Sequence, residues 1–150
     1  MAAISVKNLY KIFGKNPSNA IPLLKDGKSK DEILDETGLT VAIDNASFDV
    51  EKEETFVIMG LSGSGKSTVL RCLNRLIEPT SGEVLIGEDQ TNIMDADKEK
   101  LLELRRSRMS MVFQNFGLFP HRSVLDNVAY GLEIGGMDKS ERDEKSVEAI

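Results

Sequence analysis

Short apolar blocks separated by polar turns run along the whole chain, and this pattern predicts an α/β fold. Ile4–Phe13 alternates loosely and ends at Gly14, which indicates a strand. Ala46–Val50 and Glu83–Ile86 indicate two further strands. Thr55–Met59 is a continuous apolar run rich in strand-forming residues, so we expect it to be a central strand buried on both faces.

Helical periodicity appears between and after these strands. One helix face is predicted by apolar residues at i, i+3, i+4 and i+7, namely Val69, Cys72, Leu73 and Leu76. Asp97–Arg106 predicts an amphipathic helix with Leu101 and Leu104 on one side. The segment Met109–Phe113, which follows it, is strand-like.

Two more helices are predicted near the end of the chain from their first residues. Ser123 with Asp126 is typical of a helix start, and Gly135-Gly136 is expected to close that helix. Ser140 with Asp143 predicts the start of another.

Residues from Gly14 to about Val41 have a different character, with prolines, glycines and charges of both signs. Ser29 followed by Glu32 three residues later resembles a capping box, and Gly38 is a natural helix stop. We expect an inserted surface element with one or two short helices.

Composition narrows the class of protein. A length of 150 residues suits about one domain, and a hydrophobic content of 40% is ordinary for a globular chain. The net charge of -6 argues against nucleic acid as the main partner. The single cysteine, Cys72, cannot form a disulfide framework and suits a reducing compartment. With no apolar run of membrane-spanning length, we expect a cytoplasmic protein that reaches a membrane only by docking onto another protein.

The segment GLSGSGKST at residues 60–68 fits the phosphate-loop pattern G-x-x-x-x-G-K-[ST]. Glycines let consecutive backbone N–H groups surround a phosphate, and the following helix adds the positive end of its dipole. Lys66 is expected to reach the β- and γ-phosphates, while Ser67 binds Mg²⁺. We therefore predict a Mg-ATP site formed by Gly60, Ser62, Gly63, Ser64, Gly65, Lys66, Ser67 and Thr68.

The residues described so far do not include every group that ATP hydrolysis needs. Val84-Leu85-Ile86 followed by Gly87-Glu88-Asp89 is a poor candidate for the metal-binding acid that hydrolysis needs. Two alternatives therefore stay open at this point. One is a non-catalytic nucleotide-sensing or interaction module. The other is a small phosphate-loop kinase with lid arginines among Arg105, Arg106 and Arg108.

Longer stretches of the sequence resemble the ATP-binding subunits of ABC transporters, most closely the glycine betaine/proline (quaternary amine) importers. The matching stretches are LSGSGKST, RCLNRLIEPTSGEVLI at Arg71–Ile86 and MSMVFQNFGLFPHRSVLDNVAYGLE at Met109–Glu133. The insert before Val41 is similar to a longer insert in that subfamily. The resemblance covers nearly the whole chain.

The resemblance implies roles for further residues. Phe13 lies where the family places the aromatic that stacks on adenine, with Tyr10 as the runner-up. Gln114 matches the Q-loop glutamine, which contacts Mg²⁺ or the attacking water and so counts as a catalytic and metal-binding candidate. Phe116–Arg122 resembles the face that receives the coupling helix of a membrane permease. A second ATPase subunit in a homodimer and, indirectly, an extracytoplasmic substrate-binding protein are the other implied partners.

The resemblance also sets an expected domain layout for residues 1–150. It comprises the insert at about 14–41, the phosphate loop at 60–68, the Q-loop near 114 and the start of a helical subdomain at 123–150. The expected fold is an ABC ATPase core of mixed sheet with an antiparallel β portion near the N-terminus. The family's signature, Walker B pair and switch histidine lie downstream, so we expect these 150 residues to bind nucleotide while turning it over slowly.

Overall fold

The computed structural model describes residues 2–114 and 117–150, which form two compact units. The first unit is Met1–Arg105 and the second is Arg106–Ile150.

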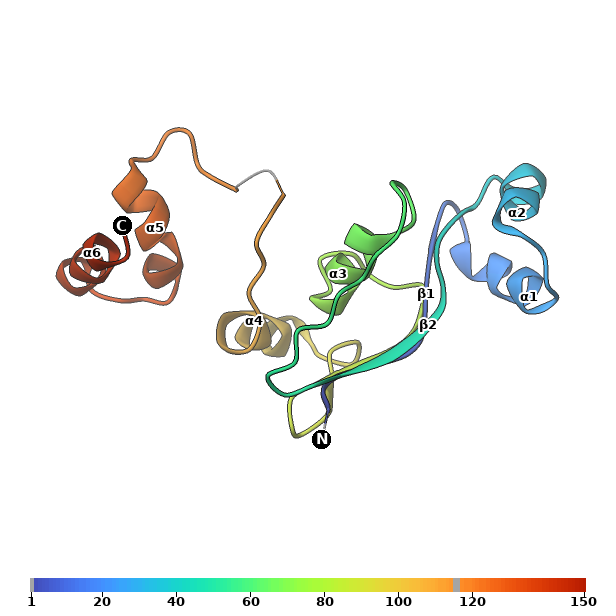
Figure 1. Ribbon diagram of the computed structural model, residues 1–150, viewed down its shortest axis with the longest axis horizontal. Coiled ribbons are helices and arrows are strands. Elements are labelled where there is room, and N and C mark those ends of the chain that lie inside the picture. The colour runs from blue at the N-terminus through green and yellow to red at the C-terminus, as the bar shows by residue number, and fades with distance from the viewer. Residues whose placement is uncertain (1, 115–116) are drawn as a thin grey trace. The chain divides into compact units, whose positions relative to one another are not determined.

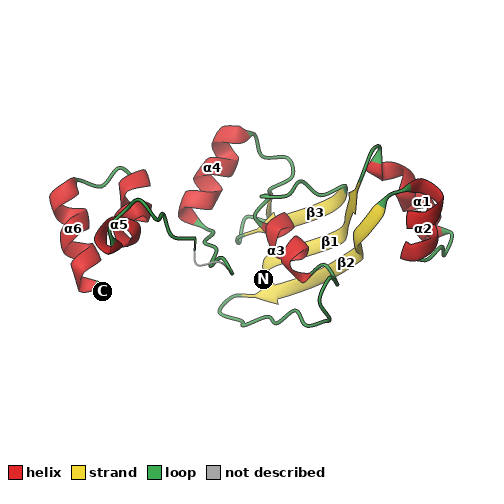
Figure 2. Ribbon diagram, turned by 90° about the horizontal axis from the view of Figure 1, so that it is seen from above, coloured by secondary structure: helices red, strands yellow, loops and turns green. Residues whose placement is uncertain are grey.

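A four-stranded antiparallel sheet organises the first unit, in the order β2-β1-β3-β4 (Figures 1 and 2). Its strands are β1 (Ala2–Phe13), β2 (Thr40–Glu51), β3 (Ser81–Ile86) and β4 (Thr91–Asn92). The first three correspond to predicted strands, and β2 begins six residues earlier than the apolar pattern indicated. Alternation of side chains places Val6 and Val84 in the core, where both are almost fully buried.

Helix α3 (Lys66–Leu73) carries the phosphate loop at its N-terminus and packs against β2. Val69 and Cys72 face the core, as the periodicity predicts, but Leu76 lies beyond the helix end and is exposed. Burial raises the pKa of the Cys72 thiol to about 11, so this residue is a protonated core side chain at neutral pH.

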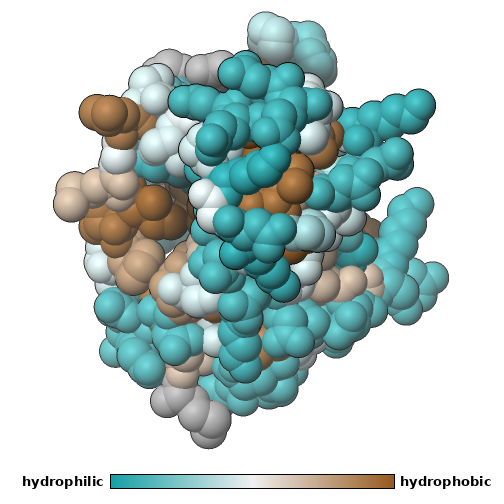
Figure 3. Space-filling view, turned by 90° about the vertical axis from the view of Figure 1, so that its right-hand side faces the viewer, coloured by the Kyte–Doolittle hydropathy of each residue, from teal (hydrophilic) through white to brown (hydrophobic). Residues whose placement is uncertain are grey.

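The insert lies between β1 and β2 and consists of a 3-10 turn (η1, Pro17–Asn19) and two helices, α1 (Ala20–Lys25) and α2 (Lys30–Thr37). The capping box at the start of α2 is confirmed, with Ser29 at the N-cap, and Gly38 ends the helix with a φ of 69°. The insert packs against the ends of β1 and β2 in a small core made of Ile12, Ala20, Ile33, Leu39 and Val41. The face of the molecule on this side is mostly hydrophilic, with smaller apolar patches (Figure 3).

Helix α4 (Lys98–Ser107) is the predicted amphipathic helix, and its Leu104 is buried. The second unit contains α5 (Val124–Ile134) and α6 (Lys139–Glu148), which pack against each other. The Ser123 cap of α5 is confirmed. Helix α6 begins earlier than predicted because the carboxylate of Asp138 caps it by accepting from the N–H of Ser140.

Two strand predictions are wrong in the described residues. Neither Thr55–Met59 nor Met109–Phe113 forms a strand, and Met59 is 86% exposed while Val112 is 97% exposed. An apolar segment becomes a strand only when a neighbouring backbone pairs with it, and none of the four described strands pairs with either segment. The described part of the chain therefore shows the predicted antiparallel β portion but no mixed sheet.

Candidate functional site: a pocket between the phosphate loop and the end of a strand

The phosphate loop reaches α3 through a residue that must be glycine. Gly65 is the N-cap of α3 and has a φ of 92°, a left-handed conformation that L side chains rarely adopt. A Cβ atom at Gly65 would lie 2.3 Å from the carbonyl oxygen of Ala42 in β2. The loop therefore packs directly on the backbone of the sheet, and this close approach fixes where α3 begins.

The side chain of Lys66 folds back across the loop. Its ammonium donates to the carbonyl oxygens of Gly60 at 2.9 Å and Leu61 at 2.7 Å, and lies 3.5 Å from the Ser64 hydroxyl. These contacts hold a positive charge at the loop opening, beside the positive end of the α3 dipole. Both charges favour an anionic ligand at this place.

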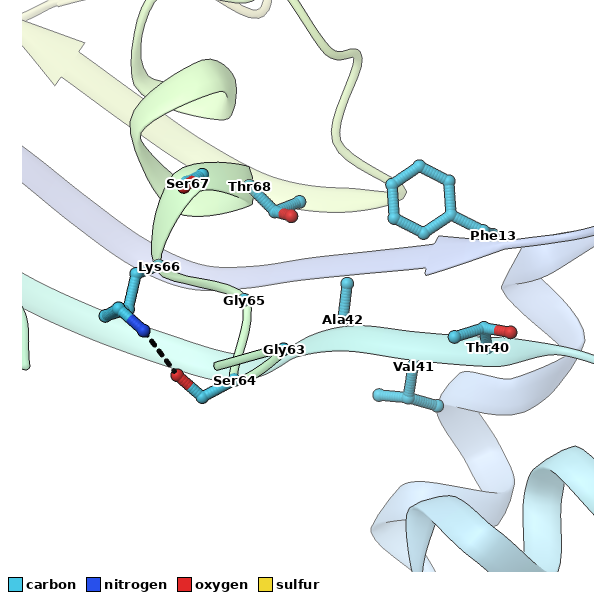
Figure 4. A pocket seen from close by; sticks show the side chains of 10 residues that line it. All are labelled: Phe13, Thr40, Val41, Ala42, Gly63, Ser64, Gly65, Lys66, Ser67 and Thr68. Carbon is cyan, nitrogen blue, oxygen red and sulfur yellow. Dashed lines mark hydrogen bonds between the residues drawn. The ribbon is translucent and has the colours of Figure 1, made fainter. Parts of the chain in front are cut away.

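A cavity of about 320 Å³ opens beside this loop. Figure 4 shows the ring of Phe13 at the end of β1 and the side chain of Thr68 at the start of α3, both facing this space. The lining residues are Phe13, Thr40, Val41, Ala42, Gly63, Ser64, Gly65, Lys66, Ser67 and Thr68. An aromatic surface at one end and a helix N-terminus at the other suit a ligand with a flat ring and a phosphate chain.

Strand pairing brings Phe13 to the loop. Phe13 is paired with Thr40 across the β1–β2 ladder, and the next residues of β2 lead to Ala42, on which Gly65 packs. Thr40, Val41 and Ala42 could not be predicted as site residues from local sequence, because this register joins residues separated by the whole insert. The runner-up aromatic, Tyr10, is buried and does not line the cavity, so it is a core residue.

Two loop residues that were predicted to bind the nucleotide lie outside the cavity lining. Gly60 and Ser62 do not line the cavity, although the Gly60 carbonyl holds Lys66. Gln114 belongs to the second unit, where its side chain is exposed, so its role at the nucleotide site stays a prediction.

The segment predicted to receive a permease helix is described from Gly117 to Arg122, and Phe116 lies outside the described residues. Asn127 of α5 organises this segment. Its side-chain amide accepts from the N–H of Phe119 at 2.7 Å and donates to the carbonyl oxygens of Phe119 and Arg122. The ring of Phe119 packs edge-on against Tyr130, with 4.6 Å between the ring centroids.

The chemistry of the loop fits a magnesium ion that arrives with its ligand. The described residues contain no group of three or more His, Cys, Asp or Glu side chains placed to hold a metal ion. Ser67 offers one hydroxyl at the cavity. Mg²⁺ usually keeps several waters and takes only one or two protein ligands when phosphates supply the rest, so the Ser67 hydroxyl suits one of these ligand positions.

None of the described helices is both long enough and apolar enough to cross a bilayer.

Comparisons with known proteins show the family of this chain. Residues 43–150 match the family described as ABC transporter. The chain is 58% identical over 150 residues to the glycine betaine/carnitine transport ATP-binding protein GbuA of Listeria monocytogenes, covering 100% of this chain and 37% of that protein. It is 53% identical over 148 residues to the glycine betaine/proline betaine transport system ATP-binding protein ProV of Escherichia coli, covering 98% of this chain and 36% of that protein.

Solved structures show the same fold. The dimeric structure of MJ0796, described as a bacterial ABC transporter cassette, superposes with a TM-score of 0.74 at 32% identity, over 97% of this chain and 54% of that one. A second dimeric structure of MJ0796, in a post-hydrolysis state bound to ADP and phosphate, gives a TM-score of 0.73 at 31% identity, over 97% of this chain and 54% of that one. The chain spans just over a third of the length of the two curated relatives above. The predicted ABC ATPase fold is confirmed, and the chain belongs to the ABC transporter ATP-binding family.

Proposed function

We propose that this chain forms the nucleotide-binding part of an ABC ATPase subunit that powers import of glycine betaine, proline or a related osmolyte. The observation that supports this most directly is the cavity in which Phe13 and the phosphate loop face the same space. The names of the relatives, which are transport ATP-binding proteins for betaines, support the choice of solute class.

In this proposal each end of the cavity takes one part of ATP. Phe13 stacks on the adenine ring, and Thr68 lies near the α-phosphate. The backbone N–H groups of residues 63–67 and the ammonium of Lys66 bind the β- and γ-phosphates, where Lys66 would leave the Gly60 and Leu61 carbonyls for the phosphate oxygens. Ser67 and Gln114 would hold Mg²⁺, which neutralises charge on the phosphates. These residues stabilise the charge that develops during phosphoryl transfer.

The proposed partners follow from the family. Gly117–Arg122 and α5 would receive the coupling helix of a permease, and a second copy of the ATPase subunit would complete the nucleotide site. A substrate-binding protein would act on the far side of the membrane. The subunit would then work at the cytoplasmic face of the membrane, attached through its permease.

The test is transport by the full-length protein assembled with its permease. We expect Lys66→Ala to abolish both ATP hydrolysis and uptake of labelled glycine betaine, because the charge at the loop opening is lost. Lys52→Ala is the matched control, since this lysine is exposed and its weak 3.4 Å ion pair with Glu88 lies at the surface. The control should keep the wild-type rates of both processes.

Other outcomes of the same assay point to other functions. Binding of Mg-ATP without release of phosphate would indicate a nucleotide sensor. Transfer of phosphate to an acceptor other than water would indicate a kinase. Hydrolysis and uptake that survive Lys66→Ala would refute the proposal.

A further inference from the structure

One face of the Phe13 ring is already occupied by a neighbouring side chain. The ammonium of Lys11 lies 4.7 Å from the centroid of this ring, within the range of a cation–π contact. Phe13 is 42% exposed and lines the cavity. Lys11 is not among the residues that line the cavity, so a flat ligand ring can approach Phe13 from the cavity while Lys11 keeps its contact with the ring.

A second contact fixes the position of this lysine. The Lys11 ammonium also donates to the carbonyl oxygen of Glu78 at 2.9 Å. A lysine side chain has four rotatable bonds and is normally mobile, so two simultaneous contacts restrict where its charge lies. The ammonium that contacts the Phe13 ring is thus held in place by the backbone carbonyl of Glu78.

The segment that holds Lys11 also clamps the end of β1. The Thr80 hydroxyl accepts from the N–H of Ile12 at 2.9 Å, and the Thr80 N–H donates to the Tyr10 carbonyl at 2.8 Å. The same segment is tied to the phosphate-binding helix, because the N–H of Ile77 donates to the carbonyl of Arg71 in α3 at 3.0 Å. A continuous set of contacts therefore joins α3 to the strand end that presents Phe13.

We propose that Lys11 is a positioning residue for the nucleotide base: it supports the Phe13 ring from behind and keeps it at a fixed place relative to the phosphate loop. Lys11 itself does not touch the nucleotide. This inference deepens the proposed function and rests on it, since it assumes that Phe13 stacks on the base. In this proposal β1 supplies two residues of the base site: Phe13 contacts the base, and Lys11 holds the Phe13 ring in position.

The test separates the base from the phosphates. Binding of Mg-ATP and of magnesium tripolyphosphate, which has no base, is measured by calorimetry on the full-length protein. We expect Lys11→Met to weaken Mg-ATP binding about three- to tenfold and to leave tripolyphosphate binding unchanged. Lys11→Arg should retain most of the ATP affinity because it keeps a cation near the ring. Lys7→Met, an exposed lysine on the same strand, is the matched control and should bind both ligands like the wild type.

The Phe13→Ala background provides the decisive comparison. There, adding Lys11→Met should cause no further loss of ATP affinity, because the ring that Lys11 supports is absent. If Lys11→Met prevents folding, as judged by its melting temperature, Lys11→Gln, which removes the charge but keeps a polar head, replaces it with the same expectation.

Several results would overturn the inference. Unchanged ATP affinity in the Lys11 variant, equal weakening of ATP and tripolyphosphate, or an undiminished effect in the Phe13→Ala background would each do so while leaving the proposed function standing. Failure of the wild-type protein to bind Mg-ATP would instead overturn the proposed function, and the inference with it.

Discussion

Gly65 connects the phosphate loop to the sheet through an approach that only a residue without a side chain permits. Its backbone is left-handed, and the Ala42 carbonyl lies where a Cβ atom would be. Gly27, in the insert, has a similar φ of 88° but nothing within 4 Å of its Cβ position. Alanine in place of Gly27 should therefore introduce only backbone strain, whereas alanine in place of Gly65 should introduce backbone strain and a steric clash.

We predict different outcomes for alanine at these two positions. Gly27→Ala should lower the free energy of unfolding by about 1 kcal/mol, the cost of the left-handed conformation alone. Gly65→Ala should lower it by at least ~2 kcal/mol and weaken Mg-ATP binding at least ~10-fold, because the loop must move away from β2. Urea unfolding and calorimetric titration measure the two quantities. Equal effects of the two substitutions on both would show that the contact with Ala42 does not position the loop.

Among the secondary structure elements, α2 shows how a local signal determines a helix start. The Ser29 hydroxyl donates to the Glu32 carboxylate at 2.7 Å, and the Ser29 N–H donates to it at 2.8 Å. The N–H and then the hydroxyl of Ser29 hold the pKa of Glu32 below its ordinary value of 4.5. Because the folded pKa is lowered, the carboxylate stabilises the folded chain above pH 4.5, and this stabilisation is lost as the pH falls through the lowered pKa.

Substitution of the cap residue should therefore have an effect that depends on pH. We predict that Ser29→Ala lowers the free energy of unfolding by about 1 kcal/mol at pH 7, and that its difference from the wild type shrinks as the pH falls below 4.5. Denaturant unfolding followed by helical circular dichroism, repeated from pH 7 to pH 3, measures this. Ser18→Ala, an exposed serine outside the capping box, is the control. A difference that stays constant over the whole pH range would contradict the assignment.

The segment Thr55–Met59 gives the opposite case, because its sequence favours a strand that the structure does not form. We predict that its backbone amides exchange with deuterium at least ~100-fold faster than those of Val6 in β1, since no ladder in the described sheet protects them. Hydrogen exchange followed by mass spectrometry on this 150-residue chain makes the comparison. Strong protection of the segment would mean that it pairs with another strand.

These elements show how far sequence reasoning reaches. The start of α2, the Ser123 cap of α5 and the core face of α3 were predictable because each depends on residues within one or two turns of helix. The absence of strands at Thr55–Met59 and Met109–Phe113 was not predictable, because strand formation depends on a partner that local sequence does not specify.

The residues of the site divide in the same way, into those set by local sequence and those brought together by strand pairing. The phosphate loop is a contiguous motif and was predictable from its residues alone. Phe13 came only from the family resemblance, and Thr40–Ala42 came from neither, since strand register brings them to the cavity.

On the scale of the whole molecule, the described cavity lies entirely within the first unit. All its lining residues belong to Met1–Arg105, whereas Gln114 and the segment from Gly117 to Arg122 belong to the second unit. In the proposed function, the contacts with the base and with the phosphates therefore come from the first unit, and Gln114 adds a metal contact from the second. The proposed coupling to a permease depends on the second unit.

Titration of the chain with Mg-ATP, beside its Lys66→Ala and Lys52→Ala variants, measures whether this loop binds the phosphates of the nucleotide. Removing the charge-assisted contacts of Lys66 should weaken binding about 10- to 100-fold, whereas the exposed Lys52 should matter little. We predict saturable binding by the wild type and by Lys52→Ala, and a large loss of affinity in Lys66→Ala. Wild-type affinity in Lys66→Ala would contradict the assignment of this loop as the phosphate-binding site.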